Sequence, residues 1–105
     1  MTTPQDTLAT WLAEEETVRA RLMPVGITPM SEVLPRTGLQ FMQGMLSGEL
    51  HPSPIGRTMA FILIEVSDGL AVFQGTPSEA HLNPMGSVHG GWFATLLDSA
   101  LGCAV

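Results

Sequence analysis

The first 24 residues show the spacing of an amphipathic helix. Apolar side chains recur at helical intervals at Leu8, Trp11, Leu12, Val18 and Leu22. Thr3 suits a helix cap, Pro4 suits the first helical position, and the stripe stops at Pro24. We therefore predict a helix that covers another part of the fold. Three glutamates at positions 14–16 favour a solvated face with a Glu15–Arg19 pair over a partner-binding site.

A second helix is predicted beyond an irregular, proline-rich connector at residues 24–36. Thr37 and Gln40 have the spacing of a capping box, and the helix should end near Gly48. Its buried face would consist of Leu39, Met42, Met45 and Leu46. Clustered methionines can also form an adaptable ligand surface, but ordinary core packing is the favoured interpretation.

The middle of the chain predicts a β-hairpin. Residues 57–67 and 70–75 are rich in branched and aromatic side chains, and Ser67-Asp68-Gly69 between them has turn chemistry. The first strand is apolar on nearly both faces. We expect one face to meet a helix and the other to be covered by the N-terminal helices or by a partner chain.

The segment from Asn83 onwards predicts a glycine-rich loop and then a helix beginning near Gly90. On a helical wheel, one arc carries Trp92, Phe93, Leu96, Leu97, Ala100, Leu101 and Ala104. The opposite arc carries only small residues and one acid: Gly91, Ala94, Thr95, Asp98, Ser99 and Gly102. We expect the large residues to face a sheet and the small ones to face a second subunit or a ligand.

Two positions on this helix suit chemistry on a thioester. Gly90 lies where backbone N–H groups lack internal acceptors, so its N–H suits the oxyanion of a thioester under attack. Asp98 suits a general base or a nucleophile. The two residues are eight positions apart, roughly 12 Å at ~1.5 Å per residue. They cannot both contact one carbonyl, so a two-fold dimer with shared sites is predicted.

These residues form the pattern N-x2-G-x2-HGG-x6-D, which follows the hairpin and the stretch GTPSEAHLNP. The pattern resembles the PaaI-like hotdog-fold acyl-CoA thioesterases, and the resemblance covers about residues 54–105. It implies an α+β fold in which an antiparallel sheet wraps a long central helix and protomers pair. It also implies Asp98 as the catalytic carboxylate, Gly90 as the oxyanion donor, Asn83 as a group that places water or thioester, and His89 as a support of the loop.

The function implied by the resemblance is hydrolysis of acyl-CoA to a free acid and CoA, without a metal or an organic cofactor. A non-catalytic acyl-CoA-binding hotdog module and another hotdog enzyme, such as a dehydratase, remain alternatives. His81, His89 and Asp98 lack tight zinc-ligand spacing. Cys103 is 14 residues from His89, roughly 21 Å along a helix, so the two cannot pair within one chain.

Composition narrows the partners and the compartment. Four arginines, no lysine and ten acids give the 105-residue chain a net charge of −6, which disfavours nucleic acid and anionic membranes. The longest apolar run, residues 59–64, is far below the ~20 residues of a membrane span. The acidic N-terminal region lacks the pattern of a signal peptide, and the single cysteine fits a reducing compartment, so we expect a cytoplasmic location.

The resemblance also implies that the domain is incomplete. Residues 1–53 would be a helical lead-in, and residues 54–105 a partial hotdog domain that lacks three or four further strands and the basic residues for CoA phosphates. One hairpin cannot cover the apolar face of the last helix, and a two-stranded sheet is marginal. We expect the 105-residue chain by itself to aggregate, bind hydrophobic dye or form strand-swapped oligomers, and to show no measurable acyl-CoA hydrolysis. The complete protein would be a homodimer or a dimer of dimers.

Overall fold

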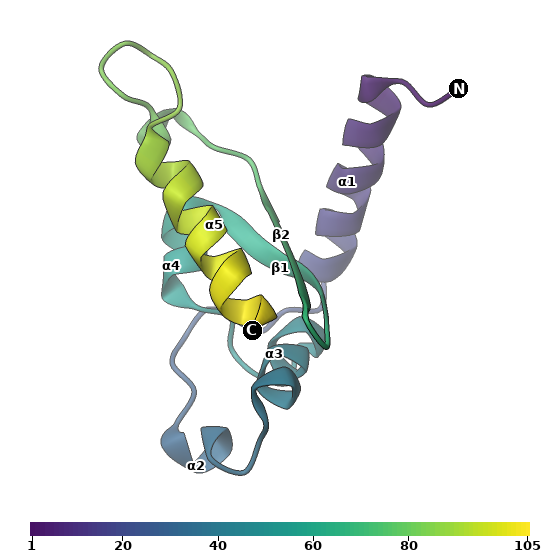
Figure 1. Ribbon diagram of the computed structural model, residues 1–105, viewed down its shortest axis with the longest axis vertical. Coiled ribbons are helices and arrows are strands. Elements are labelled where there is room, and N and C mark those ends of the chain that lie inside the picture. The colour runs from purple at the N-terminus through teal and green to yellow at the C-terminus, as the bar shows by residue number, and fades with distance from the viewer.

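The computed structural model describes all 105 residues as an α+β fold (Figure 1). Two antiparallel strands form the sheet, and five α-helices and one short 3₁₀ helix surround it. In chain order the elements are α1 (Pro4–Arg19), α2 (Met30–Val33), α3 (Gly38–Ser47), α4 (Pro54–Met59), β1 (Phe61–Ser67), β2 (Leu70–Gly75), η1 (Glu79–His81) and α5 (Gly90–Ala104). None of the helices combines the length and hydropathy needed to cross a membrane.

The two predicted N-terminal helices are confirmed, together with their caps. Thr3 and Asp6 form a reciprocal capping box at the start of α1, and Thr37 and Gln40 form another at the start of α3. Gly48 ends α3 in the left-handed conformation, with φ of 87°. An added Cβ there would lie 2.0 Å from the carbonyl oxygen of Arg21, so only glycine fits. The connector contains one helical turn, α2, that the proline pattern did not predict.

The predicted hairpin is confirmed from Phe61 onwards. β1 pairs antiparallel with β2, and Ser67 and Leu70 flank a turn in which Gly69 has φ of 75°. The register shifts between Leu63 and Glu65, which leaves Ile64 as an extra residue on β1. Such a bulge increases the local twist of the strand pair.

The start of the first strand was predicted too early. Residues 57–59 belong to helix α4, and the strand begins only at Phe61. Ser53 and Pro54 supply the cap position and first helical position of α4, while Arg57 and Met59 have no strong β preference. Ala60 then ends the helix with φ of 56°. The start signal for a helix therefore outweighs the β-rich sequence that follows it.

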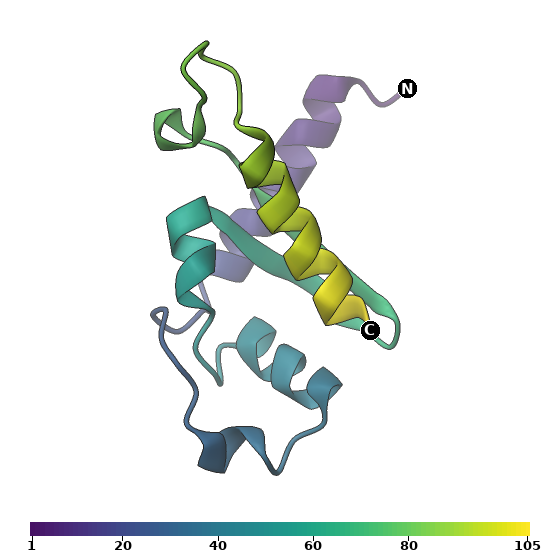
Figure 2. The same ribbon diagram turned by 60° about the vertical axis from the view of Figure 1, so that its left-hand side comes forward.

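The hairpin lies between helices from the two ends of the chain. α5 crosses the sheet on one side, mainly over β2, and α1 meets it on the other side (Figures 1 and 2). Gln74 of β2 donates hydrogen bonds to the carbonyl of Trp11 and to the carboxylate of Glu15 on α1. Glu15 also forms the predicted ion pair with Arg19, at 2.9 Å, but it is buried rather than on a solvated face. Leu8, Trp11 and Leu12 of the predicted apolar stripe are exposed, because α1 meets the sheet only near its C-terminal end. The N-terminal helices therefore share a core with the hairpin.

The core is centred on the beginning of β1. Three consecutive residues, Phe61, Ile62 and Leu63, are buried, so both faces of the strand are covered there. α3 packs against β1 and contributes the buried Met42. The predicted cover of the apolar strand by N-terminal helices on one face is thus present.

Helix α5 is rotated relative to the wheel prediction. Trp92 is buried, but Phe93, Leu97 and Leu101 of the same predicted arc are 50%, 58% and 68% exposed. The less exposed positions are Trp92, Thr95, Leu96, Ser99, Ala100, Cys103 and Ala104. The two-stranded sheet is narrower than the apolar arc, so the helix buries Trp92, partly covers Leu96 and leaves Phe93, Leu97 and Leu101 outside.

Candidate functional site

The loop before α5 is fixed by backbone and histidine contacts. Leu82 and Val88 form an isolated antiparallel bridge, and the His89 N–H donates to the His81 carbonyl at 2.8 Å. The His81 ring accepts the Ser78 N–H at Nδ1, so its Nε2–H donates to the Thr58 carbonyl, at 2.9 Å. His81 therefore joins this loop to α4. This role of His81 was not predicted, since the only signal for it in the sequence is an imidazole close to the motif.

A second contact joins the first turn of α5 to α4. The indole N–H of Trp92 donates to the carbonyl of Met59, at 2.7 Å. The indole ring also packs edge-on against Phe93 and lies tilted against His81. Because Trp92 is buried, this hydrogen bond satisfies a polar group inside the core. The N-terminus of α5 thus starts from a fixed position.

His89 caps helix α5. Its Nδ1 accepts a hydrogen bond from the Gly91 backbone N–H, at 2.8 Å. An Nδ1 that accepts places the proton of the neutral ring on Nε2. The Nε2 atom has no partner in the chain, and His89 is exposed.

Gly90 follows this cap as the first residue of α5. Its backbone N–H has no hydrogen-bond acceptor in the chain, since the helix begins at this residue and His89 takes the next N–H. A Cβ added to Gly90 would meet no atom within 4 Å. The N–H is therefore open to a ligand oxygen at the positive end of the helix dipole.

Asn83 builds the turn that precedes the cap. Its Oδ1 accepts the backbone N–H groups of Met85 and Ser87, at 3.0 and 3.2 Å. Its Nδ2 donates to the Ser87 hydroxyl, at 2.7 Å, and Gly86 in the middle of the turn has φ of 85°. The side-chain oxygen is thus committed to the loop, and one N–H of the amide remains open.

Asp98 lies two turns further along α5. It is exposed and forms no hydrogen bond or ion pair within the chain. Asp98 acts electrostatically on Cys103. Burial is the main cause that raises the pKa of the Cys103 thiol, and the negative charge of the Asp98 carboxylate raises it further. The residues four positions before and after Asp98 on the helix, Ala94 and Gly102, are small and exposed. A second polypeptide can therefore approach Asp98 closely.

The predicted site residues thus form two groups rather than one. His89 and Gly90 stand at the start of α5, with Asn83 in the turn before them, and Asp98 stands roughly 12 Å from Gly90 along the helix axis at ~1.5 Å per residue. A single copy brings no carboxylate to the Gly90 N–H. No three side chains of His, Cys, Asp or Glu come close enough together to hold a metal.

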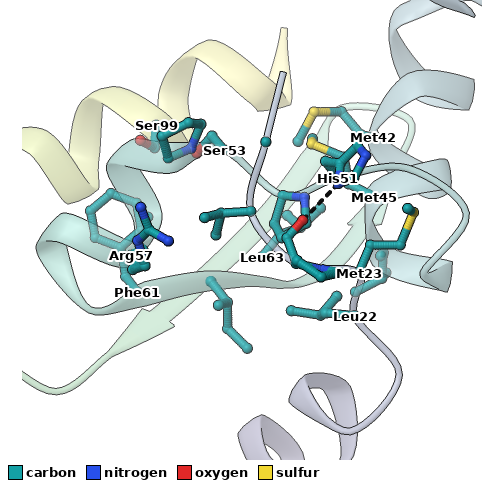
Figure 3. Close-up of a pocket in the computed structure, with 18 of the residues that line it drawn as sticks. Leu22, Met23, Met42, Met45, His51, Ser53, Arg57, Phe61, Leu63 and Ser99 are labelled. Carbon is teal, nitrogen blue, oxygen red and sulfur yellow. Dashed lines mark hydrogen bonds between the residues drawn. The ribbon is translucent and has the colours of Figure 1, made fainter. Parts of the chain in front are cut away.

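A cavity of about 900 Å³ lies between α5, β1, α3 and the connector after α1, and Asp98 does not line it (Figure 3). Ser99 and Cys103 of α5 contribute to its wall, and Met42 and Met45 of α3 line it. The methionine cluster of α3 was interpreted from the sequence as core. The structure buries Met42, which fits the core interpretation, and both Met42 and Met45 also line the cavity.

Comparison of the chain with protein-family models, with curated proteins and with solved structures yielded no match. The site is therefore interpreted from its own geometry and from the motif in the sequence.

Proposed function

We propose that this protein hydrolyses acyl-CoA thioesters at sites formed by two copies of the chain, within a hotdog-type arrangement of α5 and its sheet. The observation that carries the proposal is the open N–H of Gly90 at the N-terminus of α5. His89 holds the neighbouring N–H, and Trp92 and His81 fix the position of the turn. Such a fixed donor suits the charge that develops on a thioester carbonyl oxygen.

In the proposed reaction, the thioester carbonyl oxygen accepts a hydrogen bond from Gly90 N–H. Water attacks the carbonyl carbon while Asp98 of a second copy takes a proton from it. The tetrahedral intermediate then collapses, the carbon–sulfur bond breaks, and the CoA thiolate leaves and receives the proton. The products are a free carboxylic acid and CoA.

The proposed second copy follows from distance and from surface. Gly90 and Asp98 of one chain are too far apart to share a carbonyl, whereas two antiparallel α5 helices would place each Asp98 near the other copy's Gly90. The row of Ala94, Asp98 and Gly102 is small enough for close helix approach. The exposed side chains of Phe93, Leu97 and Leu101 on the next row favour association.

The contacts of His89 disfavour the dehydratase alternative. A histidine base must present an unprotonated ring nitrogen to its substrate. The unprotonated Nδ1 of His89 is occupied by Gly91 N–H, and the open Nε2 carries the proton. His89 therefore suits a hydrogen-bond donor or a structural cap better than a base.

A cytoplasmic location, proposed from the sequence, fits the free thiol of Cys103.

One observation favours a non-catalytic acyl-CoA-binding module as the second candidate. The Oδ1 atom of Asn83 is committed to two backbone N–H groups of its own turn, so it is not free to orient an attacking water. A binding module needs the open Gly90 N–H but not a base. The two candidates differ in their dependence on Asp98.

Steady-state release of free thiol from several acyl-CoA esters tests the proposal, with the full-length protein as the enzyme. Asp98→Asn should keep the fold and the affinity for substrate but slow hydrolysis by about 10²-fold or more. Asp68→Asn, an equal change of charge in the hairpin turn, is the matched control and should retain the wild-type rate. Unchanged binding of acyl-CoA without any wild-type hydrolysis would instead support the binding module.

A further inference from the structure

The 900 Å³ cavity has a polar end and an apolar end (Figure 3). Arg57, Ser53 and Ser99, from α4, its cap and α5, lie together at one end of the view. Leu22, Met23, Met42 and Met45 lie at the other end. A volume of this size is within the ~300–1,000 Å³ of small-molecule sites, and an apolar lining with a few polar groups is typical of them.

The walls of the apolar end are held in place by hydrogen bonds. The His51 ring donates from Nδ1 to the Pro24 carbonyl, at 2.7 Å, and the Gly26 N–H donates to the Pro52 carbonyl, at 3.0 Å. Arg21 donates from Nε to the Leu46 carbonyl, at 2.9 Å, which joins the connector to α3. These contacts join the segment after α1 to the loop before α4 and to α3, which together form this end of the cavity.

Arg57 is the only arginine without a partner in the chain. Arg19 pairs with Glu15, and Arg36 pairs with Glu32 and Glu49. Arg21 is bound to a backbone carbonyl. The guanidinium of Arg57 forms no hydrogen bond or ion pair, and Arg57 is an exposed residue that lines the cavity. In a chain of net charge −6, an uncommitted cation at one end of an apolar cavity specifies an anionic head group.

We propose that this cavity binds an unbranched fatty acid as its free carboxylate. Arg57 would bind the carboxylate, and the hydroxyls of Ser53 and Ser99 would add hydrogen bonds. The flexible, unbranched methionine side chains would adapt to a flexible alkyl tail. One cation matches one carboxylate, and the methionines and leucines match an aliphatic chain better than a planar ring.

This binding site goes beyond the proposed hydrolysis and does not require it. The cavity meets α5 through Ser99 and Cys103, whereas the open N–H of Gly90 lies at the opposite end of that helix. Asp98 does not line the cavity. A fatty acid can therefore bind whether or not the protein cleaves thioesters.

Binding of dodecanoate to the purified full chain, measured by calorimetry in the absence of acyl-CoA, tests the inference. Arg57→Gln should weaken the affinity for dodecanoate by about tenfold, the loss expected for one charge-assisted contact, and leave the weaker binding of 1-dodecanol unchanged. Arg36→Gln, which removes the same charge outside the cavity, is the control and should bind dodecanoate like wild type. Benzoate should not compete.

A steric variant tests the tail end independently. Met45→Trp should narrow the apolar end of the cavity and weaken dodecanoate binding, while Met85→Trp, in the exposed turn 88% accessible to solvent, should leave it intact. Asp98→Asn should bind dodecanoate normally even where hydrolysis is lost, which separates this inference from the proposed function. Circular dichroism melts identify any variant that fails to fold.

Three outcomes would overturn the inference. They are absence of dodecanoate binding, equal loss for Arg57→Gln and Arg36→Gln, and a change in oligomeric state with Met45→Trp without any uptake of dodecanoate. The last result would show that a second copy of the chain, rather than a fatty acid, occupies the cavity.

Discussion

The Nδ1 atom of His89 accepts the backbone N–H of Gly91 at 2.8 Å, and this contact determines which donors remain at the start of α5. It satisfies the second N–H of the helix and leaves the first, that of Gly90, without an acceptor. A histidine is an unusual cap, since Ser, Thr, Asp and Asn predominate at such positions. The same side chain therefore stabilises the helix and leaves the neighbouring N–H of Gly90 open to a ligand.

The stability of α5 should depend on this cap. His89→Ala leaves the Gly91 N–H without its acceptor and should lower the free energy of unfolding by about 1 kcal/mol. For a domain of this size, this loss corresponds to a decrease in Tm of ~4–8 °C. His89→Asn restores a good capping side chain and should recover most of the loss. Thermal melts followed by circular dichroism measure both. Equal melting temperatures for the alanine and asparagine variants would show that the cap adds no stability.

The helices and the hairpin were predictable because their signals are local. Thr3 and Thr37 each stand three residues before a side chain that completes a capping box, and both boxes form. The turn of the hairpin needs one residue with a positive φ. Glycine adopts such a φ readily, and Gly69 directly follows the polar residues Ser67 and Asp68. The loop-to-helix boundary at Gly90 was likewise marked by the glycine-rich segment before it.

The rest depends on contacts between distant segments. The last turn of α4, residues 57–59, was interpreted as strand because β-rich residues follow it directly, and Ala60 ends the helix in a conformation that no sequence pattern specifies. The wheel of α5 identified two arcs, but the width of the sheet decides which residues are buried. The cavity combines residues from the connector, α3, β1 and α5, which are far apart in the sequence. Of its lining, only the methionine cluster of α3 could be identified from the sequence as a possible ligand surface.

The exposed apolar row of α5 should drive self-association. Phe93, Leu97 and Leu101 are at least half exposed, and burial of one such side chain contributes roughly 1.5–3 kcal/mol. Leu97→Lys should therefore weaken the association of copies by about tenfold or more and reduce binding of a hydrophobic dye. Sedimentation velocity over a concentration series measures the first effect.

Leu8→Lys is the matched control for this row, because Leu8 on α1 is 54% exposed, close to the 58% of Leu97. It should leave the association constant within about twofold of wild type. A similar decrease of the association constant for both variants would mean that exposed apolar side chains in general drive association, rather than the apolar row of α5.

Shared sites predict rescue between two inactive variants. Asp98→Asn removes the proposed base, and Gly90→Pro removes the proposed donor at a first helical position that tolerates proline. In a mixed dimer, one site combines the intact Gly90 of the first variant with the intact Asp98 of the second. Isolated mixed dimers should therefore recover about half of the wild-type hydrolysis rate.

Each parent variant alone is the control for this experiment and should remain inactive. Tagging the two variants differently allows the mixed dimer to be purified and its composition verified. Mixed dimers that hydrolyse no more acyl-CoA than the parents would argue against a site built from two copies.

The reactivity of Cys103 reports on the charge of Asp98. Burial raises the pKa of the Cys103 thiol, and the nearby Asp98 carboxylate raises it further, so the folded protein holds less thiolate at a given pH than an ordinary cysteine does. Because thiolate is the reactive form, alkylation by iodoacetamide should be slow near neutral pH and should accelerate only at higher pH than for a free thiol. Asp98→Asn removes one of the two causes and should shift the rate profile to lower pH, whereas Asp68→Asn should not. Mass spectrometry of timed samples measures the rates, and in urea all three proteins should react alike. Identical profiles for folded wild type and Asp98→Asn would show that the carboxylate does not act on the thiol.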